Sequence, residues 1–238
     1  GHHRYETALN YRNYMREQVK KETGKEATGE EPFNYVMMYF ASMAEEGLDI
    51  FPIHRIIHSI DDFDGDDFLA KCGEYFDIQE MPFKEDNEKA VRKRLIDTMA
   101  EGADETTYLG LHIRERDIYY LLKLKTTDSM DDVFEGDMPD VYKHLDVSVL
   151  HALILGKLLN VSIEDQAKQK NIVYMKDTET AVRAGREETN QMTFFMNATK
   201  VSEVQSVSEA GLLMPQKSTY FYPKLLSGVV INPLSEED

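Results

Sequence analysis

The sequence predicts an α/β or α+β fold in which helices pack on a mixed β-sheet. Helical and strand periodicity alternate along most of the chain from residue 86 onward, and such alternation is typical of these two classes. No repeat of fixed period appears. With 238 residues, 42% of them hydrophobic, the chain can bury a sizeable core. We expect one domain over residues 1–238, or the C-terminal portion of a longer protein whose N-terminal region is missing.

The first predicted element is an N-terminal helix that opens directly from a Gly-His-His-Arg turn. Tyr5, Ala8, Leu9, Met15 and Val19 fall mostly on one helical face. The charged residues 20–32, with two glycines and a proline, indicate a solvated loop or a frayed helix end.

Two apolar runs follow, and both are interpreted as strands. Residues 33–40 are dense in aromatic, Met and β-branched side chains and predict a buried strand. Residues 48–57 predict a strand with a proline near its end or at a sheet edge. The acidic residues 61–68 do not fit a calcium loop, because Ile60 and Lys71 would fill ligand positions, so they predict a turn that caps a helix through Tyr75.

The remaining elements are assigned from periodicity and turn residues. Residues 106–113 and 117–125 predict a hairpin around the charged turn 114–116. The expected helices cover residues 86–100, 147–159, 178–184 and 201–209, and the further strands cover residues 171–174, 192–196 and 228–231. His151, in the apolar helix, is interpreted as a packed, hydrogen-bonded histidine, because no second metal ligand stands three or four residues away.

Net charge limits the classes of partner. The chain carries 44 acidic and 27 basic residues, a formal charge of −17. Such a surface repels nucleic acid and anionic membranes, so phosphate binding requires a local basic pocket, which suits a small metabolite. Cys72 is the only cysteine, which excludes an intrachain disulfide and a cysteine-based zinc site. No apolar run approaches the ~20 residues of a membrane span, and we expect a cytoplasmic protein.

Three segments concentrate cationic and hydroxyl groups. The first, Gly1, His2, His3 and Arg4, stands at a helix N-terminus, where free N–H groups and the helix dipole favour an anion. An affinity-tag remnant is the alternative, but two histidines are few for a tag and a helical pattern follows at once.

The second segment contains His54 and Arg55, at the end of a predicted strand. The third contains Lys217, Ser218, Thr219 and Lys224 among aromatic residues and between two prolines, and offers ammonium and hydroxyl groups to phosphate oxygens or Mg²⁺. The alternative for the third segment is an edge strand with surface lysines. The expected phosphate- or nucleotide-binding residues are therefore Gly1, His2, His3, Arg4, His54, Arg55, Lys217, Ser218, Thr219 and Lys224, with no metal site formed by the protein alone.

Several of these motifs resemble one prokaryotic family, the domain of unknown function 1015. They are GHHRYETAL at residues 1–9, residues 52–55, LDVSVLH at 145–151 and, above all, MPQKSTYFYPKLLSG at 214–228. Members of that family are longer, with a further N-terminal region that ends just before the Gly-His-His-Arg. The resemblance therefore implies that this chain is the C-terminal part and that the missing region is its natural partner.

A more distant resemblance concerns Gly1 to Tyr5. This segment is similar to the Gly-Cys-His-Arg of sulfiredoxins, to the arginine-bearing second box of ParB-like proteins and to the Gly-His-His-Arg of archaeal free serine kinases. The resemblance implies that the segment opens a helix and holds nucleotide phosphates, with His3 and Arg4 facing them. His2 stands where sulfiredoxins have cysteine, so their chemistry does not transfer, and the −17 charge argues against DNA partitioning.

These observations predict a nucleotide-dependent phosphotransferase that uses ATP or ADP with Mg²⁺ on a small hydroxyl metabolite such as serine. The general base is not assigned, because Glu6 fits helix capping and the catalytic carboxylate of the resembling kinases lies upstream of the motif. We therefore expect this chain alone to be inactive. The alternatives are a non-catalytic nucleotide or metabolite sensor and a structural domain that forms a homodimer.

Overall fold

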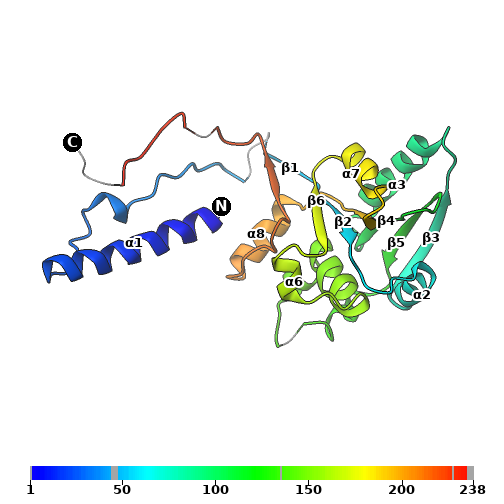
Figure 1. Ribbon diagram of the computed structural model, residues 1–238, viewed down its shortest axis with the longest axis horizontal. Coiled ribbons are helices and arrows are strands. Elements are labelled where there is room, and N and C mark those ends of the chain that lie inside the picture. The colour runs from blue at the N-terminus through cyan, green and yellow to red at the C-terminus, as the bar shows by residue number, and fades with distance from the viewer. Residues whose placement is uncertain (1, 44–47, 135, 227, 235–238) are drawn as a thin grey trace. The chain divides into compact units, whose positions relative to one another are not determined.

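The computed structural model describes residues 2–43, 48–134, 136–226 and 228–234, and it divides into two units (Figure 1). Unit 1 comprises Gly1–Leu48 and Pro223–Asp238, and unit 2 comprises Asp49–Tyr222. Within unit 1, the predicted N-terminal helix is present as α1, His2–Thr23. A hydrogen bond of 2.8 Å from Arg16 Nε to Asn34 Oδ1 links α1 to the short 3₁₀ turn η1, Pro32–Asn34.

Two strands predicted in unit 1 are wrong. In the first, residues 33–40, Phe33 lies in η1 and is buried, whereas residues 35–40 are exposed and have no regular secondary structure. In the second, residues 228–230 form bends and Ile231 has no regular secondary structure. A strand needs a neighbouring strand to pair its backbone groups, and apolar composition alone does not supply one.

The core of unit 2 is a six-stranded sheet in the order β3-β5-β4-β7-β2-β6. Its strands are β2 (His54–His58), β3 (Phe76–Pro82), β4 (Tyr108–Ile113), β5 (Ile118–Leu124), β6 (Ile172–Met175) and β7 (Asn190–Phe195). The α+β class is thus confirmed, but every pairing among the described strands is antiparallel, so the sheet is not mixed. The predicted hairpin is confirmed as β4–β5, with Gly110 opposite Leu121.

A proline divides the strand predicted at residues 48–57. Its first part, β1 (Asp49–Phe51), pairs with β8 (Tyr220–Tyr222) in a separate two-stranded sheet, and its second part is β2 of the main sheet. Pro52 stands between them and has no N–H for either ladder. This change of sheet brings the chain that follows residue 214 beside the start of β2, which matters for the site below.

Helices cover both faces of the main sheet (Figure 1). On one face α3 (Glu88–Gly102) and α7 (Thr178–Gly185) pack on strand residues such as Tyr119 and Leu121. On the other, α2 (Gly65–Tyr75) and η3 (Val149–Leu158) pack on residues such as Leu109 and Leu122. Successive strand side chains point to opposite faces, so each strand contributes to both layers. The remaining helices of unit 2 are α4 (Asp140–Lys143), α5 (Asp146–Ser148), α6 (Ile163–Ala167) and α8 (Val201–Glu209), with the 3₁₀ turn η2 (Thr127–Met130).

Local sequence explains where α2 begins, whereas η3 departs from the α-helix expected at its position. The acidic turn before α2 acts as predicted, because the Asp64 carboxylate accepts hydrogen bonds from the backbone N–H groups of Asp66 and Asp67. The helix predicted at residues 147–159 is present, but η3 is wound as a π-helix and ends with a hydrogen bond from Leu159 N to Ile154 O. π-Helical turns are rare and often occur at functional sites. In the described residues, no helix combines the length and apolar character needed to cross a membrane.

Candidate functional site

The candidate site is centred on Arg55, a guanidinium buried inside unit 2. Arg55 lies in β2 on the same side as Ile57, facing η3, and only 2% of its surface is exposed. Its guanidinium donates hydrogen bonds to the carbonyl oxygens of Ile53 and, at 3.2 Å, Lys217. The Tyr174 ring lies 5.7 Å from its central carbon. Burial lowers the pKa of Arg55 to about 10, so the group stays positively charged at neutral pH.

This positive charge is only partly compensated by the protein. Its Nε–H has no hydrogen-bond partner among the described residues, and no acidic side chain forms an ion pair with it there. A buried charge without a full set of partners costs free energy. A buried cation that lowers the stability of the folded protein is typical of a binding site.

A small polar pocket of about 20 Å³ borders Arg55. Its polar lining is contributed by Arg55, Asp146, Asn197, Thr199, Lys200, Glu203 and Ser218. The chain after β7 is tied to the third cationic segment by a hydrogen bond of 2.9 Å from Thr199 Oγ1 to the Ser218 carbonyl. Lys200 stands at the start of α8 and pairs with Asp104 at 2.6 Å. Three distant parts of the sequence thus meet around one guanidinium.

The carboxyl group of Asp146 lies in this pocket and has an unusual pKa. Asn197 Nδ2 donates to its Oδ2 at 3.4 Å. Burial raises the pKa of Asp146 to about 7, and the nearby Glu203 carboxylate raises it further, against the hydrogen bond from Thr107. Asp146 therefore changes charge near neutrality, where a proton acceptor is most effective.

A second and larger pocket, of about 250 Å³, lies against the other side of this region. We call it the aromatic pocket; it is lined by Phe134, Tyr142, Ser148, His151, Ala152, Ile163, Gln166, Ala167, Tyr174, Pro215 and Gln216. Tyr174 also contacts Arg55, and Gln216 precedes the residue whose carbonyl Arg55 binds. The charge of Arg55 adds to burial in lowering the pKa of His151 to about 4.

The structure brings two of the three predicted cationic segments together. Arg55 and Ser218 line the same polar pocket. Lys217 takes part through its carbonyl, whereas its side chain is exposed and its φ is +55°. Thr219 follows and is half-buried.

Both ring nitrogens of His54 form hydrogen bonds within the protein, so its role is structural. Its Nδ1 accepts the Met196 backbone N–H at 3.2 Å, so Nε2 carries the proton and donates to Thr178 Oγ1 at 2.9 Å. Burial, assisted by the charge of Arg55, lowers the pKa of His54 to about 4. A neutral histidine with both nitrogens engaged has no atom left for a phosphate, which the sequence did not reveal.

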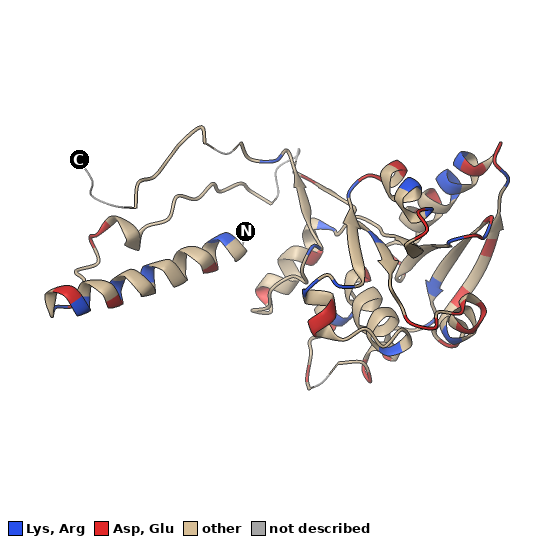
Figure 2. Cartoon of the chain, viewed as in Figure 1, with Lys and Arg blue, Asp and Glu red and all other residues tan. Residues whose placement is uncertain are grey.

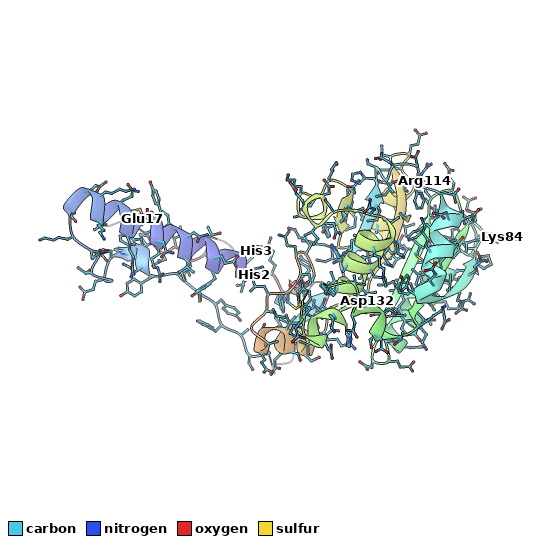
Figure 3. The ribbon with its side chains drawn as sticks, turned by 90° about the horizontal axis from the view of Figure 1, so that it is seen from below. His2, His3, Glu17, Lys84, Arg114 and Asp132 are labelled. Atoms are coloured by element: carbon cyan, nitrogen blue, oxygen red, sulfur yellow. The ribbon has the colours of Figure 1, made fainter. Side chains whose placement is uncertain are left out.

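The first cationic segment belongs to unit 1. Gly1 lies outside the described residues, and His2 and His3 stand at the first turn of α1 (Figure 3), with their rings 4.0 Å apart. His3 and Arg4 are exposed and line an open, mostly apolar hollow of unit 1. Lys224 is exposed and also belongs to unit 1. The assignment of these residues to phosphate binding remains a prediction.

Several site residues were not singled out from the sequence. Asp146 and Ser148 lie in the LDVSVLH motif, and the family resemblance of that motif is the sequence signal that points to them. Tyr174, Asn197 and Lys200 carried none. Elsewhere, lysine and arginine are interspersed with acidic residues (Figure 2), as in the pairs Arg116–Asp66 and Lys143–Asp131, so charge alone does not mark the site.

Comparisons with known proteins agree with the motif resemblance at the level of family. A family model described as "Protein of unknown function (DUF1015)" matches residues 1–148; the motif at 214–228 lies beyond that match. No curated protein matches the chain.

Solved structures show only distant similarity. A conserved hypothetical protein from Pyrococcus furiosus is 15% identical, with a TM-score of 0.40, 76% of this chain covered and 59% of that one. A free serine kinase in complex with AMP is 12% identical, with a TM-score of 0.40, and 76% and 56% covered. Its E30A mutant in complex with ADP is 11% identical, with a TM-score of 0.38, and 77% and 57% covered. The chain thus spans less than two thirds of the length of these structures.

Proposed function

This chain belongs to the DUF1015 family of proteins of unknown function, and from that premise we propose that it binds the phosphate groups of a nucleotide at Arg55. We further propose that the longer protein transfers a phosphoryl group from ATP or ADP to a hydroxyl of a small metabolite such as serine. The observation that carries the proposal is the buried, incompletely partnered guanidinium of Arg55.

An anion bound at Arg55 compensates the free-energy cost of burying this positive charge. The unused Nε–H donates to a phosphate oxygen, and charge-assisted hydrogen bonds of this kind are about twice as strong as neutral ones. Ser218 and Thr199 provide polar neighbours, and Lys200 provides a second cation at the same pocket. Because the pocket holds only about 20 Å³, one phosphate enters it when the Lys200 ammonium leaves the Ala103 carbonyl and Asp104, which hold it at 2.7 and 2.6 Å, and turns toward the phosphate.

We propose that Mg²⁺ binds together with the nucleotide. In the described residues, no group of three or more His, Cys, Asp or Glu side chains is arranged to hold a metal. Magnesium bound to nucleotides commonly uses one or two protein carboxylates together with phosphate oxygens and water. Asp146, at the edge of the Arg55 pocket, is the carboxylate that we assign to that role.

In the transfer itself, the acceptor hydroxyl oxygen bonds to the terminal phosphorus, and the bond from that phosphorus to the leaving nucleotide oxygen breaks. The hydroxyl proton must leave to a carboxylate or to water. We assign that carboxylate to the further N-terminal region that the family resemblance implies, and we therefore propose that this chain binds nucleotide without turnover.

A non-catalytic sensor is the second candidate, and one observation favours it. Both carboxylates of the polar pocket already have partners: Asp146 receives the Asn197 amide, and Glu203 accepts the Lys200 backbone N–H at 2.7 Å. A sensor binds nucleotide without consuming it even when the N-terminal region is present.

The test compares Arg55→Met with the matched control Arg94→Met, an exposed arginine of α3 in the same unit. Isothermal titration with ADP and with pyrophosphate measures binding to the 238-residue chain. We expect a loss of more than tenfold in affinity for Arg55→Met and none for Arg94→Met, because a hydrogen bond to a charged group contributes about 1.5–3 kcal/mol. Equal binding by both variants contradicts the proposal.

Turnover is measured on the longer protein with ATP or ADP, Mg²⁺ and a pool of hydroxyl metabolites that includes serine. Mass spectrometry detects any phosphorylated acceptor. An acceptor-dependent product that Arg55→Met abolishes supports the phosphotransferase. Arg55-dependent binding without product supports the sensor.

A further inference from the structure

We propose that the aromatic pocket receives a flat, amino-bearing heteroaromatic ring, the base of an adenine nucleotide, with His151 as its specificity-determining residue. This inference rests on the proposed function, because the phosphates of the same molecule are assigned to Arg55.

The walls of the pocket fit a flat ring. Phe134, Tyr142 and Tyr174 contribute aromatic surface, and Ile163 and Ala152 contribute aliphatic surface. The volume of about 250 Å³ lies just below the ~300–1,000 Å³ of pockets that hold drug-sized ligands. The pocket therefore suits one ring system and not an entire nucleotide.

Hydrogen bonds around His151 fix which of its nitrogens is free. Gln166 Nε2 donates to two backbone carbonyls, those of His151 at 3.1 Å and Val161 at 3.0 Å. Gln166 therefore presents its Oε1 to the His151 ring, and Nδ1 must carry the proton in the 2.8 Å contact between them. The opposite nitrogen, Nε2, is buried and has no partner among the described residues.

The charge state of His151 defines what its ligand must offer. Burial and the Arg55 charge lower its pKa to about 4, so the ring is neutral at physiological pH and Nε2 is a hydrogen-bond acceptor. Only a ligand with an N–H or O–H donor satisfies it. An anion without such a donor does not satisfy it. The aromatic pocket and the Arg55 pocket therefore bind different chemical groups.

Ser148 adds a second polar atom to the same pocket. Its side chain is 3% exposed, and its Oγ, like His151 Nε2, has no partner in the described part of the chain. A hydroxyl both donates and accepts. A ring with an exocyclic amino group next to a ring nitrogen offers a donor for His151 and an acceptor for Ser148, which is the arrangement found in adenine.

The two pockets lie close enough to serve one molecule. The Tyr174 ring lines the aromatic pocket and stands 5.7 Å from the Arg55 guanidinium. Ser148 lines the aromatic pocket, whereas its neighbours Val147 and Asp146 line the polar pocket. A nucleotide therefore places its base on one side of Tyr174 and its phosphates at Arg55.

The experiment measures binding of four ligands to the 238-residue chain by isothermal titration. They are AMP, purine riboside 5′-monophosphate (which has hydrogen in place of the amino group), ribose 5-phosphate and pyrophosphate. We expect AMP to bind about tenfold more tightly than the purine riboside compound, because the latter leaves a buried acceptor unpaired. Ribose 5-phosphate is expected to bind more weakly than both.

His151→Phe keeps an aromatic ring and removes the acceptor, and it is expected to bind AMP and the purine riboside compound equally. His144→Phe, at an exposed histidine that does not line the pocket, should retain the tenfold preference. Ser148→Ala removes a hydroxyl with little change in shape, and it provides a test if His151→Phe does not fold. It should weaken AMP and the purine riboside compound by similar factors, because both carry the ring nitrogen that accepts from this hydroxyl, and it should leave pyrophosphate binding unchanged.

The outcomes separate this inference from the proposed function. Arg55-dependent pyrophosphate binding with no preference between AMP and the purine riboside compound overturns the base site and leaves the phosphate site standing. A preference that persists in His151→Phe, or an unchanged affinity of Ser148→Ala for both purine compounds, also overturns the base site. If neither pyrophosphate nor AMP binds, both proposals fail.

Discussion

Acidification is expected to destabilise unit 2 through the buried histidine His54. The folded protein holds this ring neutral, with Nδ1 accepting from Met196 and Nε2 donating to Thr178. In the unfolded chain the same ring has an ordinary pKa of 6.5, whereas in the folded protein its pKa is about 4. Between these values the unfolded state binds one more proton than the folded state. The free energy of unfolding therefore falls as the pH falls from 6.5 to 4, and His54 contributes no change above 6.5.

The size of this effect follows from the two pKa values. Each pH unit between them changes the free energy of unfolding by about 1.4 kcal/mol for one group. The full loss from above pH 6.5 to below pH 4 is about 3 kcal/mol, a large part of the ~5–15 kcal/mol that stabilises a typical domain.

The measurement is urea unfolding of the natural protein and of His54→Gln at several pH values from 7.5 to 4.5. Glutamine does not titrate, and its loss of one hydrogen bond is a constant offset. His151 and Asp146 also titrate in this range, but they are common to both proteins and cancel in the difference. We expect that difference to change by about 1.4 kcal/mol per pH unit below pH 6.5. Parallel curves over the whole range refute the assignment of a neutral, buried His54.

Three further predictions concern stability and reactivity. In the natural protein the buried Glu88 carboxylate lies 3.0 Å from Arg92 Nε, and Arg92→Met removes this ion pair. We expect the free energy of unfolding measured in urea to fall by about 3–5 kcal/mol. An unchanged urea midpoint contradicts this expectation. Gly185→Ala places a methyl group 2.0 Å from Thr193 Oγ1. We expect calorimetry to show a free energy of unfolding that is lower by about 1–3 kcal/mol. An unchanged stability means that the Thr193 side chain rotates away from the methyl group. The Cys72 thiol is fully buried, and burial raises its pKa to about 12. Iodoacetamide at pH 8 should therefore label Cys72 only after the protein unfolds. Labelling of the folded protein contradicts the burial of this thiol.

Local patterns were sufficient for the elements of unit 2 whose hydrophobic period is clear. The helices α3 and α7 and the β4–β5 hairpin lie where periodicity and turn residues predicted them. The segments 33–40 and 228–231 failed for a shared reason. An apolar run is compatible with a strand, but only a partner strand makes it one, and sequence composition does not identify that partner.

The candidate site was predictable in its chemistry but not in its assembly. Cationic groups stand out in an acidic chain: Arg55 lies in a segment at the end of a predicted strand, and Lys217 lies beside hydroxyl groups between two prolines. The hydrogen bond between them joins residues 162 positions apart. Nothing in the sequence indicated that Lys217 would contribute its carbonyl and not its ammonium group. His54 had the right chemistry for a phosphate, but its two hydrogen bonds are made with Met196, just after β7, and with Thr178 of α7, and only the folded structure supplies them.

The energetics of Arg55 distinguish a binding residue from a structural one. A buried ion pair can often be replaced by apolar residues without loss of stability, and sometimes with a gain. Arg55 is even less well compensated, because its bonds go to two neutral carbonyls and its Nε–H has no partner in the described structure. Stability alone would therefore favour methionine at this position. If Arg55→Met unfolds at the same or a higher urea concentration while pyrophosphate binding is lost, the guanidinium is retained for a ligand. If the variant is instead destabilised and still binds, Arg55 is a structural cross-link between β2 and the 217–218 segment, and the phosphate site must be sought elsewhere.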